Sequence, residues 1–158
     1  MTWLPLFGTA LGAVIALGSA LLIERHRERR EDHVERRKTR QEVYSRYLAA
    51  HAEARTQLRV LSVSADLTDE ERGYQAFTAY AACYASRYEL AVLAPQAVLT
   101  LARDFDRCAR DLRDLVIAGT YAYTPGGRMR EYLDAMARVQ MAMRNDLGAD
   151  ESSLPPPD

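Results

Sequence analysis

The chain has 158 residues, of which 48% are hydrophobic, and a formal net charge of −1. Once an apolar N-terminal segment is set aside, about 135 residues remain, the usual size of one domain. A domain of this length buries a core without disulfides or bound metal. The two cysteines, Cys83 and Cys108, are expected inside helices as reduced thiols, and a disulfide between them is left open.

The N-terminal segment, residues 1–23, is predicted to be a transmembrane anchor. It contains no charged side chain, and Trp3 to Ile23 gives 21 predominantly apolar residues, ~31 Å of helix against a hydrocarbon core of ~30 Å. A cleaved signal peptide is the main alternative, because small-x-small triplets occur between Ala16 and Ala20. The absence of a basic region before the apolar stretch favours the uncleaved anchor.

Basic residues flank the anchor on its C-terminal side only. The first of them are expected to contact lipid headgroups and to set the topology: Arg25, Arg27, Arg29 and Arg30. The positive-inside rule then predicts a single-pass protein of the cell membrane, with its N-terminus outside and the remaining chain in the cytoplasm.

One face of the anchor carries a small residue at every fourth position: Gly8, Gly12, Ala16 and Ala20. Small residues let two helices approach closely in lipid, so this face predicts a parallel homodimer. The alternative is that Gly and Ala are simply frequent in such segments.

Residues 24–40 are predicted to form a charged helical stalk. They hold eight basic and five acidic residues and one aliphatic side chain, Val34, so they are expected to be solvated. No Gly or Pro occurs between Gly18 and Gly73, which favours one helix running from the anchor into the domain. Nucleic-acid binding is not expected, because the interleaved acids would repel phosphates and no aromatic residue lies among the basic ones.

Residues 41–148 show the apolar period of helices and no strand-like alternation, which predicts an all-α up-down four-helix bundle. Thr68 and Glu71 form a capping-box pattern at the start of the second helix, and Pro95 separates it from the third, as a hairpin or as a kink. Gly119 and Gly148 end the third and fourth helices, and residues 149–158 are expected to be disordered.

The residues expected to face the core follow steps of three and four. The first helix gives Tyr44, Tyr47, Leu48, His51, Ala54, Leu58 and Leu61. The second gives Tyr74, Phe77, Ala81, Tyr84, Tyr88 and Ala91, with Tyr80 alongside. The third gives Val98, Leu101, Ala102, Phe105, Cys108, Leu112, Leu115 and Val116. The fourth gives Met129, Tyr132, Leu133, Met136, Val139, Met143 and Leu147.

No motif for catalysis, a cofactor or a metal is found. The sequence lacks a Walker loop, GxGxxG, HExxH, GxSxG and CxxC, and His26 and His33 are seven residues apart rather than four. We therefore expect no enzyme activity, no cofactor and no metal site.

Five tyrosines are candidate contacts for a partner or ligand. Tyr80, Tyr84 and Tyr88 recur at steps of four, and either pack in the core or line an interface or cleft. Tyr121 and Tyr123 lie in a glycine-containing connection, where they either make contacts or close the end of the bundle.

The order of anchor, Arg/Glu-rich stalk and the segment Arg40-Gln41-Glu42-Val43-Tyr44-Ser45-Arg46-Tyr47-Leu48-Ala49-Ala50 resembles uncharacterised small single-pass membrane proteins of actinomycete-type bacteria. The resemblance implies no activity. The leading hypothesis is a membrane-anchored interaction or scaffold protein with an unknown protein partner. The alternatives are a bundle that senses a small apolar ligand and a phage-related or defence membrane effector.

Overall fold

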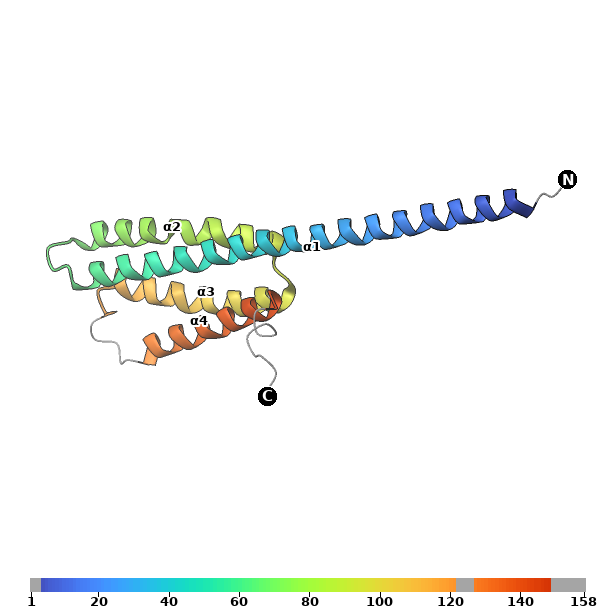
Figure 1. The fold of residues 1–158 in the computed structure, drawn as a ribbon. Coiled ribbons are helices and arrows are strands. Elements are labelled where there is room, and N and C mark those ends of the chain that lie inside the picture. Colours follow the sequence, from blue (N-terminus) through green and yellow to red (C-terminus); the bar gives the residue numbers. More distant parts are fainter. Residues whose placement is uncertain (1–3, 122–126, 149–158) are drawn as a thin grey trace, which may run out of the picture. The chain divides into compact units, whose positions relative to one another are not determined.

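The computed structural model describes the backbone of residues 4–121 and 127–148, and the side chains of residues 33–121 and 127–148. The regular structure in this part is entirely helical: α1 (Leu4–Val63), α2 (Asp69–Leu93), α3 (Gln96–Ile117) and α4 (Gly127–Asp146) (Figure 1). The chain divides into two compact units, residues 1–39 and 40–158, and α1 contributes to both. The predicted all-helical class is confirmed for the described residues.

Within residues 33–121 and 127–148, no helical segment is both long and apolar enough to cross a membrane. The predicted anchor, its small-residue face and the four arginines that follow it lie among residues whose side chains are outside the described part. These predictions therefore remain predictions.

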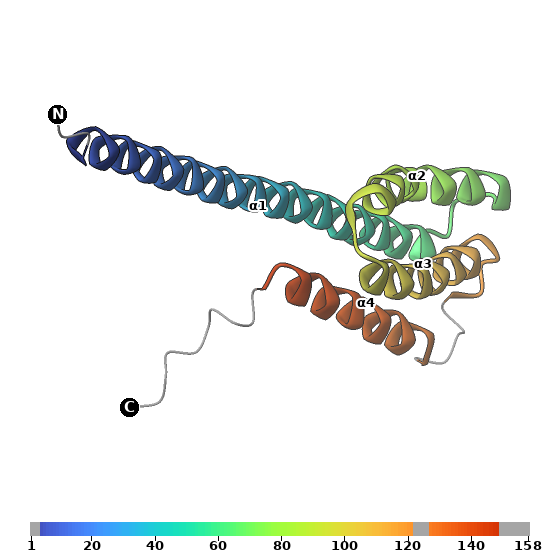
Figure 2. The ribbon, with the colours of Figure 1, turned by 90° about the vertical axis from the view of Figure 1, so that its right-hand side faces the viewer.

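In the second unit, the part of α1 from Arg40 onward and helices α2, α3 and α4 alternate in direction, as both views show (Figures 1 and 2). The main core joins large side chains from all four helices, among them Tyr47 of α1, Tyr80 of α2, Phe105 of α3 and Tyr132 of α4. A smaller cluster is formed by Leu58, Leu61, Ala76 and Val116. Every buried member of both clusters lies between Val43 and Met143, so the unit that begins at Arg40 contains all of them, and we expect this unit to fold on its own.

The core faces predicted for α1 and α3 are largely confirmed. In α1, all the predicted residues are buried except Leu48, which is half-buried, and Val43 joins them. In α3, Val98, Ala102, Phe105, Leu112 and Val116 are buried. Both helices are amphipathic, with one polar face and one apolar face, so the spacing of their apolar residues predicts which face turns inward.

Two predicted helix boundaries are also confirmed. The Thr68 hydroxyl accepts a hydrogen bond from the Glu71 N–H at 3.2 Å, and Glu71 Oε2 accepts one from the Thr68 N–H at 3.0 Å. Gly119 follows α3 with a φ of 66°, a conformation that favours glycine. The helices α2 and α3 form a hairpin rather than one kinked helix, because Ala94 and Pro95 are both extended and Pro95 is the N-cap of α3.

The predicted core face of α2 is wrong except for Tyr80, which is buried. Tyr74, Phe77, Tyr84 and Tyr88 are exposed, and the buried residues are Ala76, Ala79, Tyr80, Cys83, Ser86 and Leu90. The helix is apolar on both faces, so its period does not distinguish them. Small side chains on the buried face let α2 pack closely against its neighbours, which leaves the large aromatic rings outside.

Smaller departures occur in α3 and α4. Asp106 and Arg113 are buried, although neither was assigned to the core, whereas Leu133 of α4 is exposed. On α3, Arg107 lies 3.7 Å from Asp104, and Asp114 lies 2.7 Å from Arg113. Both cysteines are free, and burial raises the pKa of the Cys83 thiol to about 12.

Candidate functional site

The outward face of α2 is an exposed apolar stripe. The side chains of Tyr74 and Tyr88 are 74% and 70% exposed, and Phe77 and Tyr84 lie between them at 53% and 37%. Isolated exposed apolar residues are common on soluble proteins, but a continuous stripe of them usually marks a contact surface. We therefore treat the stripe as a candidate contact surface, because packing within the bundle does not cover it.

The spacing of this stripe has the period of a helix-pairing surface. Its members follow steps of three, four, three, four and three, and all are exposed: Tyr74, Phe77, Ala81, Tyr84, Tyr88 and Ala91. These steps average close to 3.5 residues, the repeat that keeps one face of a helix turned toward a second helix. We call these six residues the outer seam of α2.

Exposed apolar side chains are concentrated around this seam. Of the eleven large hydrophobic side chains that are exposed in the described part, eight lie on α2 or at the adjoining end of α1. They are Val60, Val63, Tyr74, Phe77, Tyr84, Tyr88, Val92 and Leu93. Most of the exposed large hydrophobic side chains in the described part therefore lie on the helix that carries the seam or next to its start.

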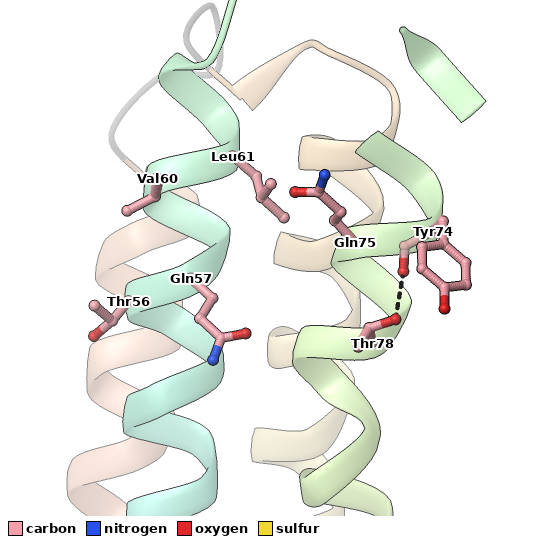
Figure 3. Close-up of a pocket in the computed structure, with 7 residues that line it drawn as sticks. All are labelled: Thr56, Gln57, Val60, Leu61, Tyr74, Gln75 and Thr78. Carbon is pink, nitrogen blue, oxygen red and sulfur yellow. Dashed lines mark hydrogen bonds between the residues drawn. The ribbon is translucent and has the colours of Figure 1, made fainter. Parts of the chain in front are cut away.

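A groove runs along the α1 flank of the seam (Figure 3). It has a volume of about 360 Å³ and is lined by Thr56, Gln57, Val60, Leu61, Tyr74, Gln75 and Thr78. Leu61 and Gln57 extend from α1, and Gln75 from α2, into the space between the helices (Figure 3). The Thr78 hydroxyl donates to the Tyr74 carbonyl oxygen at 2.9 Å, which leaves the groove wall largely apolar.

On the other flank, the buried Arg113 of α3 contacts two seam residues, Phe77 and Tyr84, and the neighbouring Tyr80. The guanidinium of Arg113 lies 4.7 Å from the centroid of the Phe77 ring and 5.2 Å from that of Tyr80. It also donates a hydrogen bond to the Tyr84 hydroxyl at 2.8 Å. Phe77 and Tyr84 are therefore held in place although both are partly exposed, which lowers the entropy cost of binding through them.

The tyrosines singled out from the sequence do not form one site. Tyr80 is buried, whereas Tyr84 and Tyr88 lie on the exposed seam. Tyr121 is half-buried and packs against both core clusters, as expected of a residue that closes the end of a bundle. Tyr123 lies outside the described residues.

The core contains a buried polar cluster that the sequence did not predict. The Tyr47 hydroxyl donates to Asp106 Oδ1 at 2.7 Å, and His51 Nε2 lies 3.2 Å from the same oxygen without hydrogen-bond geometry. Arg87 Nε lies 3.7 Å from Asp106 Oδ2. Burial, and then the Asp106 carboxylate, raise the pKa of Tyr47 above its ordinary value. Asp106 sits on the apolar face of α3, and no local pattern shows that its partners come from α1 and α2.

The spaces beside this cluster are small. The cavity next to His51 has a volume of about 10 Å³, about the room of one water molecule. A depression of about 120 Å³ reaches Asp106 between Arg87 and Arg103, well below the ~300–1,000 Å³ of usual ligand pockets. We assign the cluster a structural role. No group of three His, Cys, Asp or Glu residues in the described part of the chain is arranged to hold a metal ion.

Comparisons of the chain with protein-family models, with curated proteins and with solved structures found no match.

Proposed function

We propose that this chain is a membrane-anchored interaction protein whose α2 outer seam binds a helix of another protein molecule. The observation that carries the proposal is the exposed seam of six residues with an average step of close to 3.5. Its aromatic members are large enough for each to contribute roughly 1.5–3 kcal/mol when fully buried, before the cost of association is subtracted.

A helix is the occupant that fits this surface best. The seam follows the axis of α2 over more than two heptads, and the groove beside it takes side chains from a neighbouring helix. Along the central part of α2, the positions that flank the seam hold Thr78, Ala85 and Arg87. Arg87 already lies near the Asp106 carboxylate, so little charge opposes an apolar partner.

The anchor is the second part of the proposal. Trp3–Ile23 would hold the bundle at the cytoplasmic face, with Arg25 and its neighbours at the lipid headgroups. Confinement to a membrane raises the effective concentration of a weakly binding surface.

If a reporter fused at the C-terminus were active only when exported, the inside orientation would be wrong. Replacing Gly8 and Gly12 by Leu should weaken anchor pairing in a membrane reporter assay, and an unchanged signal would contradict the dimer face.

A second candidate function rests on the groove itself. Its volume of about 360 Å³ and its apolar lining suit a small apolar ligand, which would make the bundle a sensor. Val60→Lys would fill the mouth of the groove with charge while leaving the middle of the seam intact. A ligand-induced rise in Tm that this substitution abolishes would favour sensing over helix binding.

Site-specific photo-crosslinking in living cells tests the leading proposal. A photoreactive amino acid replaces Tyr88 on the seam in the full-length chain, and Met141 on α4 in a control chain, because both positions are well exposed. We expect a crosslinked protein product from position 88 and not from position 141. The attachment site on the partner, read by mass spectrometry, should fall on a helix with apolar residues at steps of three and four.

The seam proposal is contradicted if positions 88 and 141 give the same products, or if position 88 gives no protein adduct. A partner segment without helical periodicity would contradict the helix in particular. Tyr74→Glu, placed at the other end of the seam, should reduce the product from position 88 at least tenfold if the whole seam is covered.

A further inference from the structure

We propose that the helix bound by the outer seam belongs to a different protein and carries an acidic side chain that enters the depression between Arg87 and Arg103. The inference rests on the proposed function and names the chemistry of its partner. It is carried by an arginine-lined hollow that continues the seam at one end.

The seam has a hollow beside each of its ends. The last two seam residues, Tyr88 and Ala91, line the depression of about 120 Å³ between α2 and α3. This volume is below that of usual ligand pockets and suits one side chain of a partner. At the other end, Tyr74 lines the groove toward α1. A helix that covers the whole seam therefore reaches both hollows.

The depression carries positive charge at its rim. Arg87 of α2 and Arg103 of α3 both line it, and both side chains are exposed. The acidic residue in its lining is Asp106, whose side chain is only 7% exposed and accepts a hydrogen bond from the Tyr47 hydroxyl. The depression thus presents two guanidinium groups to the solvent, whereas its one carboxylate is buried.

The two arginines differ in how far their charge is met within the bundle. Arg87 Nε lies 3.7 Å from Asp106 Oδ2. The guanidinium of Arg103 makes no hydrogen bond or ion pair with any residue that the structure describes, and the adjacent Asp104 lies 3.7 Å from Arg107 instead. Arg103 is therefore a cation that depends on water for its solvation.

A helix bound to the seam would remove part of that water. Covering Tyr88 and Ala91 brings the partner to the rim of the depression, and a charge that is desolvated without a counter-charge costs free energy. A carboxylate placed between the two guanidinium groups offsets this cost, because their paired N–H donors match its geometry. An Asp or Glu on the edge of the partner helix therefore favours binding, and a purely apolar helix is disfavoured.

A second copy of α2 does not supply this carboxylate. In a parallel pair, the flank of α2 that carries Arg87 would meet the opposite flank of the second copy. That flank holds Thr78, Ala85 and Val92, none of which is acidic. An antiparallel pair would place the points where α1 enters the two bundles at opposite ends, which does not suit two anchors in one membrane. The partner is therefore assigned to a different protein.

The two hollows also set the length of the partner helix. Tyr74 and Ala91 are 17 residues apart, which corresponds to ~25 Å along α2. Leu61 and Gln75 extend into the groove, whose largely apolar wall suits an apolar side chain (Figure 3). The partner should thus be a helix of about 17 residues or more, with an apolar residue at the groove end and the acidic residue at the arginine end.

Charge reversal in the full-length chain tests the inference. Arg103→Glu is combined with the photoreactive amino acid at position 88, in living cells. We expect at least tenfold less crosslinked protein, because glutamate repels the incoming carboxylate, and a smaller loss with Arg103→Gln. Arg107→Glu is the matched control, since Arg107 lies on the same helix outside the depression and should leave the product within twofold. Equal losses from Arg103→Glu and Arg107→Glu would overturn the inference.

The identity of the partner residue gives a second test. With the natural arginines, mass spectrometry locates the attachment sites from positions 74 and 88. We expect both on one helix, about 14 residues apart, with an Asp or Glu within four residues of the site reached from position 88. Replacing that acidic residue by Arg should restore the product in the Arg103→Glu chain. Absence of the acidic residue, or a product that is not restored, would contradict the inference.

The outcomes separate this inference from the proposed function. A helical partner whose product does not respond to Arg103→Glu leaves the proposed function standing and removes the acidic residue. A second copy of this chain as the crosslinked protein would do the same. If position 88 yields only lipid adducts or none, both the proposed function and the inference fail.

Discussion

The Arg113 guanidinium carbon lies 4.7 Å above the centroid of the exposed Phe77 ring, so a buried residue of α3 supports the outward face of α2. The same guanidinium lies 5.2 Å from the centroid of the Tyr80 ring and donates a hydrogen bond to the Tyr84 hydroxyl. The seam is therefore part of the packed structure and not a set of loose side chains. A surface that is ordered before it binds loses less entropy on association.

Arg113→Ala should lower the free energy of unfolding of the unit that begins at Arg40 by about 1–3 kcal/mol, because it removes ring contacts and a hydrogen bond to Tyr84. Arg113→Lys should be less destabilising than Arg113→Ala, since an ammonium retains the charge but not the planar stacking. Urea denaturation measures both. Arg103→Ala on the exposed face of α3 is the control, and equal effects of Arg113→Ala and Arg103→Ala would refute the role of Arg113.

The buried pair of Tyr47 and Asp106 should show energetic coupling. Tyr47→Phe leaves the carboxylate without its closest donor, and Asp106→Asn changes the acceptor, so the double variant should be less destabilised than the sum of the two by about 1 kcal/mol or more. Tyr44→Phe is the matched control, because Tyr44 donates to Asp146 instead, at 2.6 Å. Additive effects of Tyr47→Phe and Asp106→Asn in urea denaturation would contradict the pairing.

Buried phenols should make the bundle sensitive to alkali. Burial raises the pKa of Tyr47 and of Tyr80, and it raises that of Tyr132 to about 12. In the unfolded chain these groups ionise near pH 10. Above that pH the folded state binds more protons than the unfolded state, so stability, which is complete below pH 10, falls as pH rises.

Each such group contributes a slope of about 1.4 kcal/mol per pH unit between its unfolded and folded pKa values. Tyr47→Phe should therefore reduce the loss of stability between pH 10 and pH 11 by about that amount. The measurement is urea denaturation of the isolated bundle at several alkaline pH values. An unchanged slope in the variant would show that Tyr47 ionises equally in both states.

The start of α2 depends on its capping box. Thr68→Ala removes the acceptor for the Glu71 N–H and should cost about 1 kcal/mol. Thr68→Ser retains the hydroxyl and should cost much less. Chemical denaturation with far-UV circular dichroism is the measurement, and equal losses for the two variants would show that the hydroxyl is not what stabilises the helix start.

Much of the fold was predictable from the sequence because most of its helices oppose a polar face to an apolar one. The stripe from Tyr44 to Leu61 predicts the buried face of α1 correctly, and Thr68 with Glu71 predicts where α2 begins. These signals are local. They depend on the helical period and on hydrogen bonds within four residues, both of which can be read from the chain.

The face of α2 could not be predicted, because a helix with aromatic residues on one side and Ala, Cys and Leu on the other has two apolar faces. In the folded bundle, α2 turns its face of small residues toward α1 and α3. The spacing of its apolar residues does not show which of the two faces is buried. The buried Asp106 also escaped prediction, because its partner Tyr47 is 59 residues away in the chain. The spacing of three and four residues that led to the wrong core prediction for α2 is the same spacing that defines its outer seam.

Oxidative footprinting of side chains tests the central claim, that the outer seam is covered in the assembled protein. Hydroxyl-radical labelling of the full-length chain in its membrane is compared with that of the dilute isolated bundle, and mass spectrometry reads the oxidation of Tyr74, Tyr88 and Met141. We predict that Tyr74 and Tyr88 become several-fold less reactive in the membrane, whereas Met141, 63% exposed on α4, does not change. Equal reactivity of Tyr74 and Tyr88 in the two samples would contradict the account.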